Sequence, residues 1–186
     1  MLILLIVVAV LMLFAVFAYN RLVRLRQAWK QAFADIDVQL KQRQDLVPNL
    51  VETVKGYAAH ESGVFTEVTQ ARAAAMGATS VGEKSAAEGA LSGALGRLFA
   101  VAENYPQLKA NDNFLRLQDE LNDIENKIAA ARRFMNSAVA EYNGAIQQFP
   151  AVLIAGPFGF QPAEMFALDA GERAETKNAP KVSFGG

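Results

Sequence analysis

His60 and Glu61 are the residues that most directly suggest chemistry, because an adjacent His and Glu on a helix occur in zinc metalloproteases. Such an enzyme needs a second histidine four residues on, where the stretch HESGV has valine. His60 is the only histidine and the chain has no cysteine, so a closed zinc site would need carboxylates alone. The sequence therefore predicts no metal or cofactor, and it favours a helix end or a partner-facing surface for His60 and Glu61.

Four carboxylates within seven residues are the other candidate for acid–base chemistry: Asp119, Glu120, Asp123 and Glu125. On a helix these side chains point to several faces, and basic residues follow at Lys127, Arg132 and Arg133. A solvated charged flank or ion pairs between helices explain this run better than catalysis does. The sequence also lacks a GxSxG nucleophile motif, a phosphate-binding loop and a dinucleotide fingerprint. We therefore predict a protein that is not an enzyme.

The first eighteen residues, MLILLIVVAVLMLFAVFA, contain no charged or polar side chain. As a helix they extend about 27 Å, close to the hydrocarbon thickness of a bilayer, which predicts a membrane anchor over residues 1–20. A cleaved signal peptide is the alternative, since Val16 and Ala18 could form a cleavage site, but no basic segment precedes the apolar run.

Basic residues follow this span within ten positions: Arg21, Arg24, Arg26 and Lys30. Positive charge beside a span tends to stay in the cytoplasm, so we expect a single-pass inner-membrane protein with a cytoplasmic domain, the periplasmic face being the alternative. The net charge is −1, which gives no basic footprint for nucleic acid. The lipid bilayer is thus the expected partner at this end.

Residues 114–149 carry the clearest periodic pattern in the chain. Apolar positions alternate at intervals of three and four: Phe114, Leu117, Leu121, Ile124, Ile128, Ala131, Met135, Ala138, Tyr142, Ala145 and Phe149. This spacing predicts one long helix with a coiled-coil-like seam. The cluster at Asn111 supplies capping oxygens at its start, and Pro150 ends it.

A similar stripe leaves the span and resumes in nearly the same phase beyond a proline: Leu22, Leu25, Trp29, Phe33, Ile36 and Leu40, then Val47, Leu50, Val54 and Tyr57. Because the phase is kept, we expect a kinked helix rather than a chain reversal at Pro48. Arg43 lies in the seam. We interpret Arg43, Asp45, Pro48 and Asn49 as a structural polar hinge, with merely solvated side chains as the alternative.

Between these helices the sequence predicts weaker elements. Residues 77–84 are small and polar and predict a loop. Helical spacing returns at Leu91, Leu95, Leu98 and Ala102, and Tyr105 and Pro106 end that helix. The expected fold is an all-α antiparallel bundle over residues 21–149, followed by an irregular apolar segment over 150–168 and a disordered tail over 169–186.

The apolar segment lacks a role inside a bundle of this size, so we expect it to pack on the bundle or on a neighbouring subunit. Its candidate subunit contacts are Phe149, Leu153, Phe158, Phe160 and Phe166. Asn136 and Asn143 lie seven residues apart, beside the seam of the last helix. Solvent exposure is the default for asparagine, but the pair could form a polar ladder with the hinge that fixes helix register.

Several blocks of this chain resemble the LemA family: YNRLVRLRQAW, QRQDLVPNLVETVKGYAAHE, the AR at Ala71 and Arg72, the stretch AENYPQ through QQFP, and GFQP. The resemblance implies a membrane-anchored helical bundle and supplies no catalytic residues. It also implies structured contacts for Arg43, Asp45, Pro48, His60, Glu61, Glu125, Arg132, Asn136 and Asn143. Met135 stands where relatives usually have tyrosine.

Two functions are compatible with these features. The first is a non-enzymatic, membrane-anchored scaffold that self-associates into a homo-oligomer. The second is a membrane-tethered adaptor that presents a helical groove to a signalling or membrane-protein partner, with the helix ends at His60, Glu61, Tyr105 and Pro106 as its contact points. The candidate interaction residues are completed by Arg72, Glu125, Arg132, Asn136 and Asn143.

Overall fold

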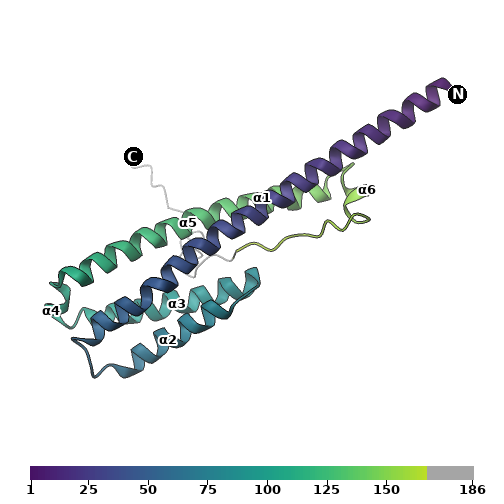
Figure 1. Cartoon of the computed structure of the whole chain (residues 1–186). Coiled ribbons are helices and arrows are strands. Elements are labelled where there is room, and N and C mark those ends of the chain that lie inside the picture. Colours follow the sequence, from purple (N-terminus) through teal and green to yellow (C-terminus); the bar gives the residue numbers. More distant parts are fainter. Residues whose placement is uncertain (167–186) are drawn as a thin grey trace, which may run out of the picture.

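A computed structural model describes residues 1–166. This part of the chain contains no strand and consists of helices α1 (Leu2–Lys55), α2 (Ser62–Gly77), α3 (Val81–Ala102), α4 (Pro106–Lys109), α5 (Asp112–Gln147) and α6 (Val152–Ala155) (Figure 1). The predicted all-helical class is confirmed. The predicted disordered tail over 169–186 lies outside the described residues.

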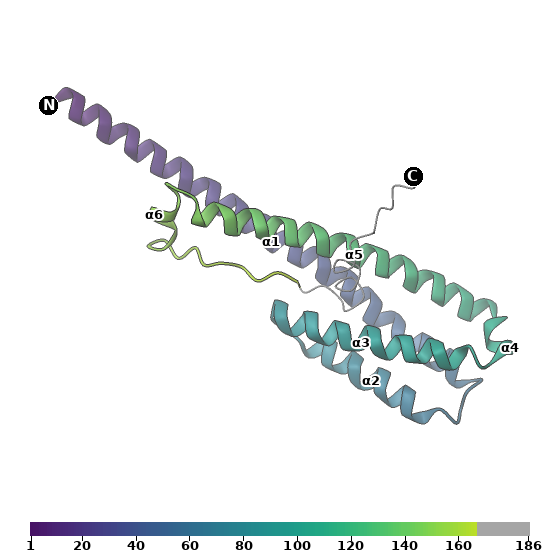
Figure 2. The same cartoon turned by 180° about the vertical axis from the view of Figure 1, so that it is seen from behind.

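Helices α1 and α5 run antiparallel and lie side by side from the point where α1 leaves its exposed N-terminal part (Figures 1 and 2). The α2–α3 hairpin packs beside them at the end of the bundle where α1 stops at Lys55, which we call the distal end. Residues 161–166 are extended and run back along the bundle from α6 (Figure 2). The last helix therefore pairs with the membrane-emergent one, as predicted.

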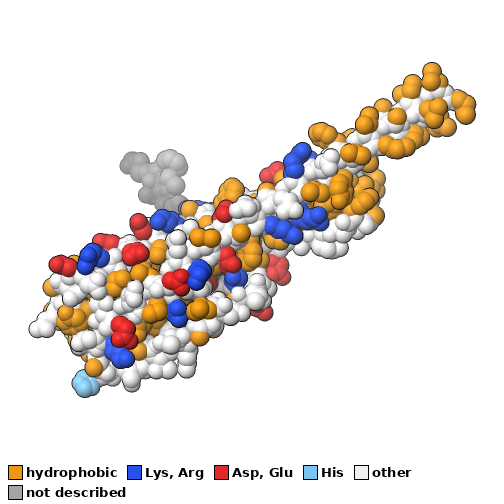
Figure 3. All heavy atoms as spheres, viewed as in Figure 1, with side chains coloured by type: hydrophobic (Ala, Val, Ile, Leu, Met, Phe, Trp, Pro, Cys, Tyr) orange, Lys and Arg blue, Asp and Glu red, His pale blue; other side chains and the backbone are white. Residues whose placement is uncertain are grey.

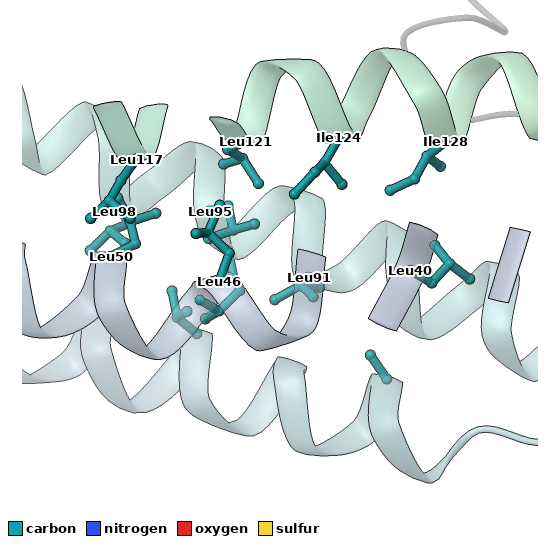
Figure 4. Packing of buried hydrophobic residues seen from close by; sticks show 14 of the residues in the cluster. Leu40, Leu46, Leu50, Leu91, Leu95, Leu98, Leu117, Leu121, Ile124 and Ile128 are labelled. Atoms are coloured by element: carbon teal, nitrogen blue, oxygen red, sulfur yellow. The ribbon is translucent and has the colours of Figure 1, made fainter. Parts of the chain in front are cut away.

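Helices α1, α3 and α5 supply most of the core of the bundle, and α2 adds Phe65, Val68 and Ala75. Figure 4 shows side chains from α1, α3 and α5 converging: Leu40, Leu46, Leu50, Leu91, Leu95, Leu98, Leu117, Leu121, Ile124 and Ile128. Burying each fully is worth about 1.5–3 kcal/mol. The predicted α5 seam is buried as far as Ala145 except at Ala131 and Ala138, which are half-buried, whereas Phe149 is 80 % exposed because α5 ends at Gln147.

Side-chain caps set two of the helix starts. The Asn111 oxygen accepts hydrogen bonds from the Asn113 and Phe114 amides, both at 3.0 Å, which confirms the predicted cap. Ser80 and Glu83 form a capping box at the start of α3, and the hydrogen bonds that the Glu83 carboxylate accepts from Ser80 and Thr79 lower its pKa to about 2. This box starts α3 at Val81, so the predicted loop over 77–84 is too long.

Pro48 lies inside α1, which continues through it as one helix, as predicted. A proline has no N–H to donate to the carbonyl four residues back, here that of Gln44. The partner comes from another helix: Nε of Arg72 on α2 donates to the Gln44 oxygen at 2.6 Å. The proline thus leaves the Gln44 carbonyl of α1 free to accept a hydrogen bond from α2.

We expect the Arg72 bond to matter only while Pro48 is present. Arg72→Met leaves a carbonyl without a partner and should lower the free energy of unfolding by about 1–3 kcal/mol. In the Pro48→Ala background the new amide can satisfy Gln44, so the same change should cost less than about 1 kcal/mol. Circular dichroism of the detergent-solubilised chain measures both losses.

The control is Arg97→Met, which removes an exposed ion pair between α3 and Glu67 of α2. Its cost should be the same in both backgrounds, since Arg97 makes no bond to Gln44. Equal costs for Arg72→Met with and without Pro48 would contradict the account.

Candidate functional site

Arg43 is the most deeply buried charged residue among those described, with 2 % of its side chain exposed. Its place in the apolar stripe of α1 turns the side chain into the bundle between Leu40 and Val47. A guanidinium in such surroundings loses its hydration, and burial without partners would be too costly to tolerate. The folded chain must therefore supply acceptors from the neighbouring helices.

Those acceptors come from α3 and α5. Nη1 of Arg43 donates to Glu125 Oε1 at 2.6 Å and to Ser92 Oγ at 2.8 Å. Nη2 donates to the Glu88 backbone oxygen at 3.2 Å and also pairs with the Glu88 carboxylate. The Gln44 amide donates to the same carboxylate. We call Arg43, Gln44, Glu88, Ser92 and Glu125 the Arg43 cluster, and it joins α1, α3 and α5.

Electrostatics keep Arg43 charged. Burial by itself would lower its pKa, but the negative charges of Glu125 and Glu88 outweigh that effect and raise the pKa above its ordinary value. An arginine that stays protonated cannot exchange a proton in catalysis, so it serves as a fixed cation. The cluster is suited to holding helices in register.

A cavity of about 270 Å³ adjoins the cluster, and Arg43, Glu88, Glu125 and Arg132 line it together with Phe166 from the C-terminal segment. Arg132 is buried on α5, next to Ala131, which the sequence placed in the seam.

The four carboxylates of the predicted acidic flank do not lie together. Glu125 belongs to the Arg43 cluster, whereas Asp119, Glu120 and Asp123 are exposed. Within residues 1–166 no three acidic or histidine side chains are arranged to hold a metal ion.

The predicted hinge residues do not all meet in this cluster. Asp45, Pro48 and Asn49 are exposed, and Asp45 pairs with Lys41 of its own helix at 3.2 Å. The prediction that Asp45 forms part of a polar hinge with Arg43 is thus corrected: the residue lies on the outer face of α1.

Glu88, which the sequence analysis missed, is 4 % exposed. The spacing of three from Glu88 to Leu91 continues the α3 pattern backwards, and this was the available signal.

Asn136 and Asn143 bind the extended C-terminal segment and not the hinge, which corrects the predicted ladder. The Asn143 side chain donates to the Ala163 oxygen at 2.9 Å and accepts from its amide at 2.8 Å. Asn136 makes the same pair of bonds with Phe166, at 2.9 and 2.8 Å. Each asparagine side chain thereby supplies the donor and the acceptor that a neighbouring strand would offer to one residue of the extended segment.

The spacing of this ladder follows from helix and strand geometry. Seven helical residues advance about 10.5 Å, and three extended residues, from Ala163 to Phe166, advance about 10 Å. Tyr142 adds a third contact by donating to the Gln161 oxygen at 2.9 Å, and burial raises the pKa of this phenol. We call Asn136, Tyr142 and Asn143 the tail ladder.

The remaining predicted residues fall at two places. His60, Glu61, Tyr105 and Pro106 lie at the distal end, where Figure 3 shows the single histidine exposed at the tip. Asn111 donates to the Tyr57 hydroxyl at 3.0 Å and joins the two turns there.

In the apolar segment, Phe160 and Phe166 are buried in the chain's own core, so the prediction that they contact another subunit is corrected. Phe149, Leu153 and Phe158 are exposed at 80, 64 and 60 %. The segment thus packs on its own bundle through one face and leaves the other uncovered.

The chain is similar to a known protein family and to individual proteins. The model of the LemA family matches residues 32–184. The chain is 26 % identical over 174 residues to magnetosome protein MamQ of Magnetospirillum gryphiswaldense and 27 % identical to magnetosome protein MamQ 2 of Paramagnetospirillum magneticum. Each match covers 80 % of this chain and 64 % of the relative, so the chain spans less than two thirds of these relatives' length.

Removing the cation of the Arg43 cluster should strongly destabilise the bundle. Arg43→Met leaves Glu88 buried without its partner, for which we expect a loss of about 3–5 kcal/mol in the free energy of unfolding. The double variant Arg43→Met with Glu88→Met should lose less, because it also removes the carboxylate that Arg43→Met leaves buried without its partner. Arg97→Met, at an exposed pair, should cost less than about 1 kcal/mol. A double variant less stable than Arg43→Met alone would contradict the account.

Removing the tail ladder should release residues 161–166 without unfolding the bundle. In Asn136→Ala with Asn143→Ala, each of the Ala163 and Phe166 amides loses its acceptor, and amide exchange there should accelerate on the order of tenfold. Hydrogen exchange followed by mass spectrometry measures this. Asn122→Ala, an exposed position on α5, is the control and should leave the exchange of 161–166 unchanged.

Proposed function

The chain belongs to the LemA family, and from that membership and its helical architecture we propose that it is a non-enzymatic, membrane-anchored scaffold that self-associates at the membrane. The observation that carries this proposal is the continuity of α1. Residues 2–17 of this helix are exposed and apolar, and the same helix then enters the core of the bundle at Leu22 without a break. By length and composition α1 can cross a membrane.

This continuity makes the anchor and the bundle one mechanical unit. The 36 residues from Asn20 to Lys55 extend about 54 Å, and α5, with 36 residues, returns over the same length. The Arg43 cluster and the docking of Arg72 on Gln44 stiffen α1 along this stretch. A scaffold of this kind holds its distal end about 50 Å from the bilayer, on the cytoplasmic side if Arg21, Arg24 and Lys30 orient the span.

Self-association is proposed through the outer face of α5. The predicted polar flank of that helix carries one large aromatic side chain, Phe134, which is 62 % exposed. Aromatic rings are enriched where subunits meet, and the charged neighbours Arg133 and Glu141 supply a polar rim. The relatives are named as magnetosome proteins, which supports a structural role for this chain over a catalytic one.

A groove favours the adaptor as the second candidate. It has a volume of about 420 Å³ between α1, α2 and the start of α3, and it exposes Val38 and Met76 beside Lys41 and Asp37. A crosslinker attached at Val38→Cys in native membranes separates the two functions, since the chain has no cysteine of its own. A distinct, reproducible crosslinked partner that Met76→Glu abolishes, with the crosslinker still attached at Val38→Cys, would support the adaptor.

The scaffold is tested by the mass of the detergent-extracted protein, from light scattering with the detergent contribution subtracted. We expect a uniform oligomer for the unaltered chain and a smaller species for Phe134→Ser, because the variant removes the apolar centre of the proposed contact. Leu115→Ser, at a 42 % exposed position of the same helix, is the matched control and should leave the mass unchanged. A monomeric unaltered chain would overturn self-association.

A further inference from the structure

We propose that residues 149–158, which we call the α6 turn, form a second membrane contact that inserts its apolar face into the interface of the bilayer beside the α1 span. The proposal rests on the membrane anchor of the proposed function and adds to it a second, monotopic attachment. The occupant of this surface is therefore lipid, at the boundary between headgroups and acyl chains.

The composition of the segment suits such a place. No charged residue occurs between Glu141 and Glu164, a stretch of 22 residues. Within it the α6 turn has two faces: Ala151 and Ala155 are buried against the bundle, while the opposite side exposes large apolar groups. The exposed set is Phe149, Val152, Leu153 and Phe158, at 80, 45, 64 and 60 %.

Direct contacts fix the α6 turn at the depth where the span ends. The ring of Phe158 meets Tyr19, the residue after the apolar run, edge-on at 5.2 Å between centroids. The Phe160 ring lies 5.5 Å from that of Tyr19 between centroids, and the Arg26 guanidinium lies 4.7 Å from the centroid of the Phe160 ring. Figure 3 shows the apolar surface of this region adjoining that of the N-terminal part of α1.

The position of the α6 turn beside the end of the span favours lipid as the molecule that covers its exposed apolar face. A turn in contact with Tyr19 lies within one or two helical turns of the span, so its uncovered side chains reach the interface without any change of fold. Tyr19 and Phe158 are rings of the kind that bilayer interfaces accept, and apolar faces buried a few ångströms into the headgroup boundary hold monotopic proteins. Arg21 and Arg24 are exposed beside this level, where they can meet anionic headgroups.

A second contact has a mechanical consequence that one helix cannot provide. A single span leaves the bundle free to rotate about the axis of α1, whereas the α6 turn, pinned to α5 and α1, fixes which side of the bundle faces the membrane. The tail ladder then holds residues 161–166, which follow this turn, on α5. The α5 face with Phe134 is thereby kept at a set orientation.

The test uses nitroxide labels on the full chain, reconstituted in vesicles of phosphatidylethanolamine and phosphatidylglycerol. Because the chain has no cysteine, Leu153→Cys gives one labelling site, and Leu153 is exposed enough to carry the label without unfolding. Collision with oxygen, which concentrates in the bilayer, is compared with collision with a water-soluble nickel chelate. Phe14→Cys in the span and Met76→Cys on α2, 53 % exposed, are the reference sites.

We expect the oxygen-to-nickel ratio at position 153 to exceed that at 76 several-fold and to approach that at 14. A ratio equal to that at 76 would overturn the proposal. So would a label at 153 shielded from both reagents, with spin–spin broadening that disappears on dilution with unlabelled chain, because a second copy would then cover the turn. A water-accessible label at 14 would overturn the anchor itself, whereas failure at 153 alone leaves the anchor standing.

Discussion

A buried guanidinium must be given acceptors, and this requirement organises the bundle. Arg43 stands in the apolar stripe of α1, so α3 must present Glu88 and Ser92 and α5 must present Glu125 at one level. Apolar packing alone would tolerate small slips of one helix along another, whereas hydrogen bonds of fixed direction do not. A second hydrogen bond between helices lies beside this cluster. Pro48 leaves the Gln44 carbonyl without a donor from its own helix, and Arg72 of α2 donates to it.

The C-terminal segment is a structural element although it has almost no regular structure. Residues 161–166 are extended and their backbone groups would be unpaired on a helical surface. The side-chain amides of Asn136 and Asn143 pair with the backbone N–H and C=O groups of Phe166 and Ala163, each donating one hydrogen bond and accepting one. The arrangement returns the chain along α5, buries Phe166 beside the Arg43 cluster, and leaves the α6 turn beside the span.

The N-terminal part of α1 and the bundle belong to one helix. Helix α1 continues without a break from its exposed apolar part into the core, so the same backbone carries that part and Arg43. The chain belongs to the LemA family, and the Arg43 cluster holds α1, α3 and α5 together. The outer face of α5 and the groove beside Val38 are the proposed surfaces for contact with another copy or with a partner.

The sequence by itself determined the helices and their inner faces. Periodicity placed the α5 seam, Asn111 capped it, and the unbroken phase across Pro48 predicted one helix, because these signals act between residues a few positions apart. Only the tertiary structure decided the partners: Glu88 for Arg43, Arg72 for Gln44, and residues 163 and 166 for the two asparagines. Such pairings join residues that are 20 to 45 positions apart, and they depend on how whole helices pack against one another. No local pattern encodes that packing, so it was here that the predicted ladder and the role of Asp45 needed correction.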